Sequence, residues 1–265
     1  MSIVIAVSNQ KGGVAKTTTC VSLGAAIVER GHEVLAIDLD PQANLSLALG
    51  VNTANLRRTV ADVFLGNHTP VSVSRETVLP GLDLMPANQD LQLVEKFLHT
   101  VMGQAAGGPA YTLRQALARV AVYDFVLCDC PPALGNITLN ALTAADLLLI
   151  PTQCEYFSAH GLNDVLELAQ HVRERTNPRL NYRILITMFD RRNRVHHTIR
   201  EQIKNAFGEA LFETMIETDT KLRESPVFGQ PITHYAPHSR AAQQYRALAE
   251  ELLRYAQQQK TTQPA

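Results

Sequence analysis

Short runs of consecutive apolar residues recur along the chain, and segments with helical periodicity separate them. Each run is typical of a strand that is buried on both faces. The clearest helices are Thr17–Arg30, which ends before a capping Gly31, and Gly161–Arg175. Because strands separated by helices pair in parallel through right-handed crossovers, the pattern predicts an α/β fold with a single doubly wound, mostly parallel sheet flanked by helices. The apolar runs cover Ile3–Val7, Glu33–Leu39, Asp124–Cys130, Leu147–Thr152 and Asn181–Phe189, with a less regular sixth at Leu211–Ile216.

The 265 residues suffice for one large domain, and no internal repeat divides them. We expect this domain to span residues 1–256. Residues 257–265 are polar, which predicts a frayed C-terminal tail that begins at Gln257. Small residues between Gly103 and Pro109 predict a surface loop inside the domain.

Composition narrows the class of protein. Apolar residues make up 46% of the chain and charged residues 18%, as in ordinary globular domains. The formal net charge of −1 excludes a globally basic nucleic-acid binder but leaves room for a local basic patch. The N-terminus lacks the pattern of a secretory signal, and no apolar run reaches membrane-spanning length. The sequence therefore predicts a cytoplasmic protein.

The four cysteines, at positions 20, 128, 130 and 154, favour buried and reduced thiols. Three of them lie in or beside apolar strands or the first helix. Cys128 and Cys130 lack further partners at metal-ligand spacing, so their closeness in sequence favours a structural role over metal binding.

A run of small and basic residues joins the first strand to the first helix. Small residues here allow backbone N–H groups to surround phosphate oxygens, and the helix N-terminus adds partial positive charge. Lys16 would contact the β- and γ-phosphates of a nucleotide, and the Thr17 hydroxyl would bind Mg²⁺. Gln10 and Ala15 stand where the ordinary phosphate-loop pattern has glycine, so the run fits the deviant form K-G-G-x-x-K-T. The run consists of Lys11, Gly12, Gly13, Val14, Ala15, Lys16, Thr17 and Thr18.

From Asn9 to Thr18 the chain closely resembles the start of ParA/Soj-type partition ATPases, a branch of P-loop NTPases that includes MinD. The resemblance implies that the protein binds ATP and Mg²⁺, hydrolyses ATP and forms an ATP-dependent homodimer. It also implies a catalytic role for Lys11, which would reach the nucleotide held by the partner subunit. The family usually has glycine at the place of Ala15, whose Cβ resists a positive φ. We therefore expect this position to affect both nucleotide affinity and turnover.

Acidic residues lie near the carboxyl ends of two predicted strands, at the edge where open α/β sheets bind ligands. Asp38 and Asp40 belong to a D-x-D-P-Q segment, and Asp129 follows an apolar run. The first segment resembles the family's first switch, which implies that Asp40 positions the attacking water and that Asp38 lies near the Mg²⁺ shell. Asp129 matches the acid of a Walker B strand and would hold Mg²⁺ through water, with residues 131–135 as the second switch.

The resemblance to Soj-type proteins continues beyond the switches, in segments 139–146 and 151–157. Two later segments, 187–192 and 225–229, resemble family regions near the adenine base. They imply base contacts from Met188, Asp190, Pro226, Val227 and Phe228.

The periphery of the chain bears on the choice between DNA and a membrane as partner. MinD-type proteins end in a basic amphipathic helix, whereas the apolar stripe in 243–255 suits packing on the sheet and lies beside the acids Glu250 and Glu251. We therefore expect no membrane binding. The resemblance to Soj implies non-specific DNA binding by the dimer, and a solvated charged face is the alternative for each basic residue. Basic residues at matching places are Lys221, Arg223, Arg240 and Arg246.

The resemblance implies a nucleoid-associated switch that partitions or positions a chromosome, a plasmid or a protein cargo. A ParB-like or cargo-adaptor protein would stimulate its slow ATP hydrolysis. Two alternatives that do not use DNA stay open: a MinD-like ATPase, and a relative of the nitrogenase iron protein or of iron–sulfur scaffold proteins. Relatives of the second kind place cluster-binding cysteines at the dimer face, whereas Cys128 and Cys130 lie on or beside the Walker B strand.

Overall fold

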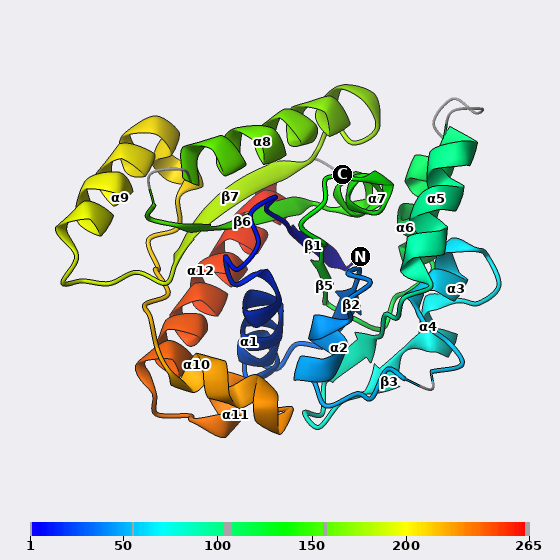
Figure 1. The fold of residues 1–265 in the computed structure, drawn as a ribbon, viewed down its shortest axis with the longest axis horizontal. Coiled ribbons are helices and arrows are strands. Elements are labelled where there is room, and N and C mark those ends of the chain that lie inside the picture. The colour runs from blue at the N-terminus through cyan, green and yellow to red at the C-terminus, as the bar shows by residue number, and fades with distance from the viewer. Residues whose placement is uncertain (1, 55, 103–107, 156–157, 263–265) are drawn as a thin grey trace.

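A computed structural model describes residues 2–54, 56–102, 108–155 and 158–262. Its centre is a seven-stranded sheet in the order β3-β4-β2-β5-β1-β6-β7 (Figure 1). Neighbouring strands are parallel except for the short pair β3–β4 at one edge. The strands are β1 (Ile3–Val7), β2 (Val34–Asp38), β3 (Arg75–Glu76), β4 (Leu82–Met85), β5 (Phe125–Asp129), β6 (Leu147–Gln153) and β7 (Asn181–Thr187).

Helices cover both faces of the sheet (Figure 1). One apolar layer joins the sheet to α1 and α12, and the other joins it to α5, α6, α7 and α8. The α-helices are α1 (Lys16–Val28), α2 (Asn44–Ala48), α3 (Val60–Phe64), α4 (Pro70–Val73), α5 (Leu91–Met102), α6 (Thr112–Leu117), α7 (Asn136–Ala144), α8 (Ser158–Arg175), α9 (Arg194–Phe207), α10 (Lys221–Glu224), α11 (Ile232–Tyr235) and α12 (Arg240–Thr262). Short 3-10 helices are η1 (Gly108–Tyr111), η2 (Gly208–Ala210) and η3 (Ser225–Phe228).

The doubly wound, mostly parallel architecture is confirmed, and five of the predicted strands form β1, β2, β5, β6 and β7 within two residues of their expected ends. The four cysteines are buried free thiols, as expected. The sequence did not predict β3 and β4, because two and four residues are too short for a periodic signal.

The predicted strand Leu211–Ile216 is wrong. Among the described residues, the segment runs beside β7 and makes one isolated bridge with it, between Leu211 and Ile184, and a second bridge joins Glu217 to Phe189 beyond the ends of both. Between the bridges, the backbone amides of Glu213 and Thr214 donate to the carboxylate of Glu251 on α12, at 2.8 and 3.0 Å. The amides of Phe212 and Ile216 still donate to Ile184 and Ile186, but the intervening Thr214 amide donates to Glu251, so the ladder with β7 is not continuous.

The polar C-terminal segment also differs from expectation, because α12 continues to Thr262 instead of fraying from Gln257. The boundary between a domain of residues 1–256 and a tail stays a prediction. Of the predicted loop at 103–109, residues 103–107 lie outside the described residues, and Gly108 begins η1.

The sheet order brings distant parts of the chain together at one edge. β5 lies between β1 and β2, so that Asp129 pairs in register with Val7 on one side and with Asp38 on the other. The loop after β1 therefore starts beside both predicted acidic segments, at the carboxyl edge of a parallel sheet.

Candidate nucleotide-binding site

The predicted phosphate loop connects β1 to α1 and takes two left-handed backbone conformations. Gly13 has φ +74° and Ala15, directly before α1, has φ +67°. The carbonyl of Ala15 accepts the first helical bond of α1, from the amide of Thr19 at 2.9 Å. Ala15 thus adopts the left-handed conformation that its Cβ disfavours by roughly 1–2 kcal/mol.

The ends of two neighbouring strands hold this loop in shape. The Gln153 side-chain amide donates to the Gly13 carbonyl at 3.0 Å, and the Thr187 hydroxyl donates to the Val14 carbonyl at 3.1 Å. Neither residue was predicted from the sequence. Their polar side chains at the ends of the apolar β6 and β7 were the available signal.

Lys16 lies buried at the start of α1, and its ammonium group donates to the Lys11 carbonyl at 3.2 Å. Burial lowers the pKa of Lys16, while the nearby carboxyl of Asp129 acts in the opposite direction. A cation held inside the loop by the loop's own backbone is suited to contact phosphate oxygens.

Thr17, in the first turn of α1, contacts Asp129, the last residue of β5. The Thr17 hydroxyl donates to Asp129 Oδ2 at 2.7 Å, while the buried Oδ1 has no hydrogen-bond partner among the described residues. Burial, and then the charge of Asp38, raise the pKa of Asp129 to about 8. An orphaned carboxylate oxygen next to a hydroxyl is a donor set that fits Mg²⁺, and a bound cation would favour the ionised carboxylate.

Asp38 ties the first predicted switch to α2. Its Oδ2 accepts from both the amide and the hydroxyl of Ser46, at 2.8 and 2.7 Å, and its Oδ1 accepts from the amide of Asp40 at 3.2 Å. Burial raises the pKa of Asp38 to about 6, against the effect of these hydrogen bonds. Both oxygens are engaged, so Asp38 shapes the loop that follows β2. Its place in a cation shell stays a prediction.

Asp40 is half-buried at the mouth of the site. Its Oδ1 accepts from the Gln42 amide at 2.9 Å, and its carbonyl accepts from the Ala43 amide. Ala43 has φ +56°, so the loop turns back sharply into α2. Asp40 thus lies on a turn of defined shape after β2, and its role in orienting water stays a prediction.

Lys11 extends from the loop toward the end of β6. Its ammonium group forms an ion pair with Glu155, at 2.5 Å, and the two side chains are 32% and 53% exposed. Its backbone amide donates to the buried side chain of Asn9 at 3.0 Å. The sequence did not predict Glu155 as the partner of Lys11.

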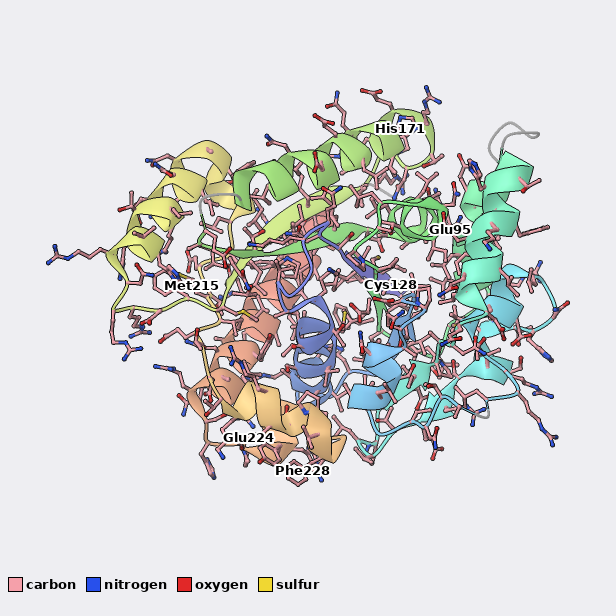
Figure 2. The ribbon with its side chains drawn as sticks, in the orientation of Figure 1. Glu95, Cys128, His171, Met215, Glu224 and Phe228 are labelled. Atoms are coloured by element: carbon pink, nitrogen blue, oxygen red, sulfur yellow. The ribbon has the colours of Figure 1, made fainter. Side chains whose placement is uncertain are left out.

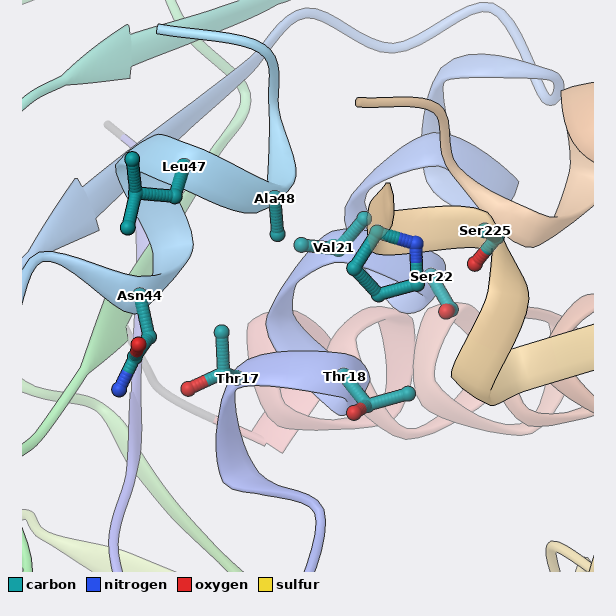
Figure 3. A pocket seen from close by; sticks show the side chains of 9 residues that line it. Thr17, Thr18, Val21, Ser22, Asn44, Leu47, Ala48 and Ser225 are labelled. Atoms are coloured by element: carbon teal, nitrogen blue, oxygen red, sulfur yellow. The ribbon is translucent and has the colours of Figure 1, made fainter. Parts of the chain in front are cut away.

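The residues expected near adenine lie on two sides of the site. Met188, with φ +51°, follows β7 and accepts a hydrogen bond from Gln153, while Asp190 binds Arg192. Pro226 of η3 lines a pocket of about 230 Å³ that also includes Thr18 (Figure 3). The pocket lies between α1, α2 and η3, and its remaining lining residues are Thr17, Val21, Ser22, Asn44, Leu47, Ala48 and Ser225.

Val227 and Phe228 are not among the described residues that line this pocket, and 81% and 63% of their surfaces are exposed. The Phe228 ring stacks on Tyr235 with centroids 5.2 Å apart. Phe228 lies at the outer end of η3 (Figure 2). Contact of these two residues with a base stays a prediction.

Most of the basic residues considered for DNA binding have acidic partners. Arg246 binds Glu29 through two nitrogens, at 2.6 and 2.9 Å. In the described part of the chain, the exposed side chain of Arg223 has no ion pair. The other pairs are Lys221 with Glu224 and Arg240 with the buried Glu217.

Across the described residues, no group of three or more His, Cys, Asp or Glu side chains could hold a metal ion by itself. A separate observation is that none of the described helices is long and apolar enough to cross a membrane.

A deviant phosphate loop at the carboxyl edge of a doubly wound sheet, with an acid at the end of the adjacent strand, defines a P-loop NTPase. The chain belongs to the ParA/MinD-type ATPase family: residues 2–182 match the family model described as "AAA domain". It is 40% identical over 254 residues to the chromosome partitioning protein ParA of Caulobacter vibrioides, covering 94% of this chain and 93% of that protein. It is 37% identical over 254 residues to the sporulation initiation inhibitor protein Soj of Bacillus subtilis, covering 95% and 98%.

Solved structures agree with this family. A cobyrinic acid a,c-diamide synthase from Mycobacterium smegmatis, with bound ADP and magnesium, is 36% identical with a TM-score of 0.84, over 97% of this chain and 96% of that chain. The septum site-determining protein MinD of Pyrococcus horikoshii, complexed with Mg-ADP, is 26% identical with a TM-score of 0.77, over 97% and 98%. These relatives share one fold but carry different names, so the fold alone does not define what this ATPase acts on.

Proposed function

We propose that this protein is an ATPase switch that dimerises on ATP, binds duplex DNA non-specifically as a dimer, and partitions or positions a chromosome, a plasmid or a protein cargo. The observation that carries the proposal is the deviant phosphate loop closed over Thr17 and the orphaned Oδ1 of Asp129. The two relatives named above that act in partitioning and sporulation control cover nearly the whole chain.

The substrates are ATP and water, with Mg²⁺ as the cation. Thr17 and Asp129 would hold Mg²⁺, which supplies charge neutralisation at the phosphates when bound. Backbone N–H groups of residues 12–17 and the ammonium group of Lys16 bind the phosphate oxygens. Asp40, at the mouth of the site, orients the attacking water.

Dimerisation follows from the place of Lys11. Its ion pair with Glu155 is half-exposed, so exchanging this partner for the phosphates of a second subunit's nucleotide costs little. Each subunit then completes the other's site. Hydrolysis removes the phosphate contacts of Lys11 that hold the dimer closed. A ParB-like or cargo-adaptor protein accelerates this slow step.

DNA binding rests on the exposed basic residues of α10 and the start of α12. Arg223 has no ion pair among the described residues and can bind a phosphate, whereas Lys221 and Arg240 share their charge with Glu224 and Glu217. Dimerisation doubles such a surface, and phosphate contacts give binding that weakens with salt. On this proposal the protein is associated with the nucleoid.

The test measures binding to duplex DNA of random sequence with ATP, ADP or no nucleotide, over a series of salt concentrations. Asp40→Ala holds the ATP-bound state. We expect binding with ATP only, with a steep loss as salt rises. Absence of binding in every nucleotide state would remove DNA as the partner and favour a MinD-like switch that acts on another surface.

A further inference from the structure

α5 places a carboxylate against the start of α7, immediately after the second predicted switch. Glu95 Oε1 accepts from the backbone amide of Asn136 at 2.7 Å and from its side-chain amide at 2.9 Å. Glu95 Oε2 accepts from the amide of Ile137 at 2.9 Å. One side chain, 41 residues away from Asn136 in sequence, thus accepts from three donors at the start of α7, and it lies between α5 and α7 (Figure 2).

Gly135 allows this close approach. A Cβ built on Gly135 would lie 2.6 Å from Glu95 Oε1 and 3.0 Å from its carboxyl carbon. A side chain at position 135 would therefore displace the Glu95 carboxylate. The backbone angles do not call for glycine, because φ of Gly135 is −91°.

The segment 131–135 is attached at both ends. At its start, the Cys130 amide donates to the Val7 carbonyl at 3.1 Å, next to Asp129. At its end, the Thr138 hydroxyl donates to the Ala133 carbonyl at 2.7 Å, from the first turn of α7. The position of α7 therefore sets the position of 131–135, and Glu95 sets the position of the first turn of α7.

The negative charge of Glu95 also faces the positive end of α7, which favours the same arrangement. The opposite face of α5 exposes Leu93 and Phe97, at 64% and 48%, so within the described residues α5 packs on the rest of the domain with the face that carries Glu95.

We propose that Glu95 is a positioning residue for ATP hydrolysis: it holds the first turn of α7, and through it the segment 131–135, in the arrangement that the reaction requires. The inference rests on the ATPase cycle proposed above. Glu95 does not touch the phosphate loop, so it acts on the rate of the reaction and on the order of the second switch, not on ATP affinity.

The test compares Glu95→Gln with a matched change at another helix start, Asp62→Asn, where the Asp62 carboxylate accepts from the Thr59 amide at 2.8 Å at the start of α3. Both changes replace a capping carboxylate with an amide of the same shape, and we expect similar falls in melting temperature. In the absence of DNA, kcat for Mg-ATP hydrolysis should fall about tenfold in Glu95→Gln. It should stay near the wild-type value in Asp62→Asn. Affinity for a fluorescent ATP analogue should be unchanged in both.

Hydrogen exchange of the segment 131–139 gives a second readout that does not need hydrolysis. In the wild type we expect ATP to protect this segment relative to ADP, and in Glu95→Gln we expect that protection to be lost. Gly135→Ala keeps the carboxylate but displaces it. If Glu95→Gln folds poorly, Gly135→Ala is measured in its place, and we expect the same loss of protection.

Wild-type kcat and wild-type protection of 131–139 in both Glu95→Gln and Gly135→Ala would overturn the inference. A wild-type protein that hydrolyses no ATP would refute the proposed ATPase cycle, and the exchange comparison would still decide the role of Glu95.

Discussion

Lys11 and Glu155 form an ion pair within one chain, between the phosphate loop and the residue two positions after β6. The pair holds the Lys11 ammonium group outside the phosphate site of its own chain. If Lys11 acts on a partner subunit's nucleotide, this contact has to open whenever the dimer forms. On the proposed function, the pair therefore competes with dimerisation.

Lys11→Ala should bind ATP with near wild-type affinity and fail to dimerise with ATP, because Lys16 still occupies the loop. Glu155→Gln should dimerise at a protein concentration several-fold lower than the wild type, because Lys11 no longer has to leave a carboxylate. Sedimentation at a series of concentrations measures both effects. Normal ATP-dependent dimers of Lys11→Ala would refute the role of this lysine in the partner's site.

Folding stability should respond little to either change, since exposed ion pairs contribute about 0–1 kcal/mol. Urea unfolding of Glu155→Gln provides the control that the dimerisation effect does not arise from altered stability.

Gly229 is where η3 meets the loop after α2. Its φ is +62°, and a Cβ built on it would lie 2.9 Å from the Cα of Gly50. Gly229→Ala should lower the free energy of unfolding by about 2–4 kcal/mol, from backbone strain together with the forced separation of the two loops. Gly66→Ala is the matched control, because Gly66 has φ +74° and nothing within 4 Å of a built Cβ.

Gly66→Ala should cost only the strain of a positive φ, about 1–2 kcal/mol. Equal losses in the two variants, measured by urea unfolding, would mean that the approach of Gly229 to Gly50 relaxes without cost. Weaker ATP binding in Gly229→Ala alone would support a role of the Pro226 pocket in holding the nucleotide.

Arg223 and Arg246 should differ in their effect on DNA binding. Arg223→Ala should weaken ATP-dependent binding several-fold and reduce its salt dependence by about one phosphate contact. Arg246→Ala should weaken it less, because the two hydrogen bonds to Glu29 already occupy that guanidinium. Arg119→Ala, at an exposed site after α6, controls for net charge. Equal effects of all three changes would point to net charge and not to a defined surface.

Asp146 gives a pH dependence that does not involve the nucleotide site. Burial raises its pKa, although the Val4 amide donates to Oδ2 at 2.9 Å. A raised carboxyl pKa means that the folded protein binds more protons than the unfolded chain, so this group lowers stability as pH rises above about 4. Relative to the wild type, Asp146→Asn should therefore gain unfolding free energy as pH increases from about 4.

Urea unfolding at several pH values measures this gain. The comparison variant is Asp164→Asn, at an exposed position of α8. A difference between Asp146→Asn and the wild type that does not change with pH would contradict the assignment.

The parts of the site that were predictable from sequence are those that lie within a few residues of one another. The phosphate loop and the two acidic segments have local patterns, and the alternation of apolar runs with helices fixed the class of fold. Ala15 is an example of a local conflict that the sequence exposed and the structure retains, with φ +67°.

The contacts that hold the site in shape were not predictable, because they join residues far apart in the chain. Ser46 binds Asp38 across the first switch, Gln153 reaches Gly13, and Glu95 reaches Asn136. Each is a common polar residue with no local pattern that distinguishes it from a surface residue. The strand prediction for 211–216 failed for the same reason, since the competing acceptor Glu251 lies far away in sequence, on α12.

The place of β5 between β1 and β2 has a consequence for synthesis of the protein on the ribosome. The first strand is made early, but its two neighbours are β5 and β6, so it has no strand to pair with until residues 125–129 emerge. By contrast, β2 can pair with β4 before that, and only its other side waits for β5. Until then the nascent chain carries the apolar β1 with neither of its neighbours and β2 with one side unpaired, so this stretch of translation is the period in which the chain is most open to aggregation and to chaperone binding.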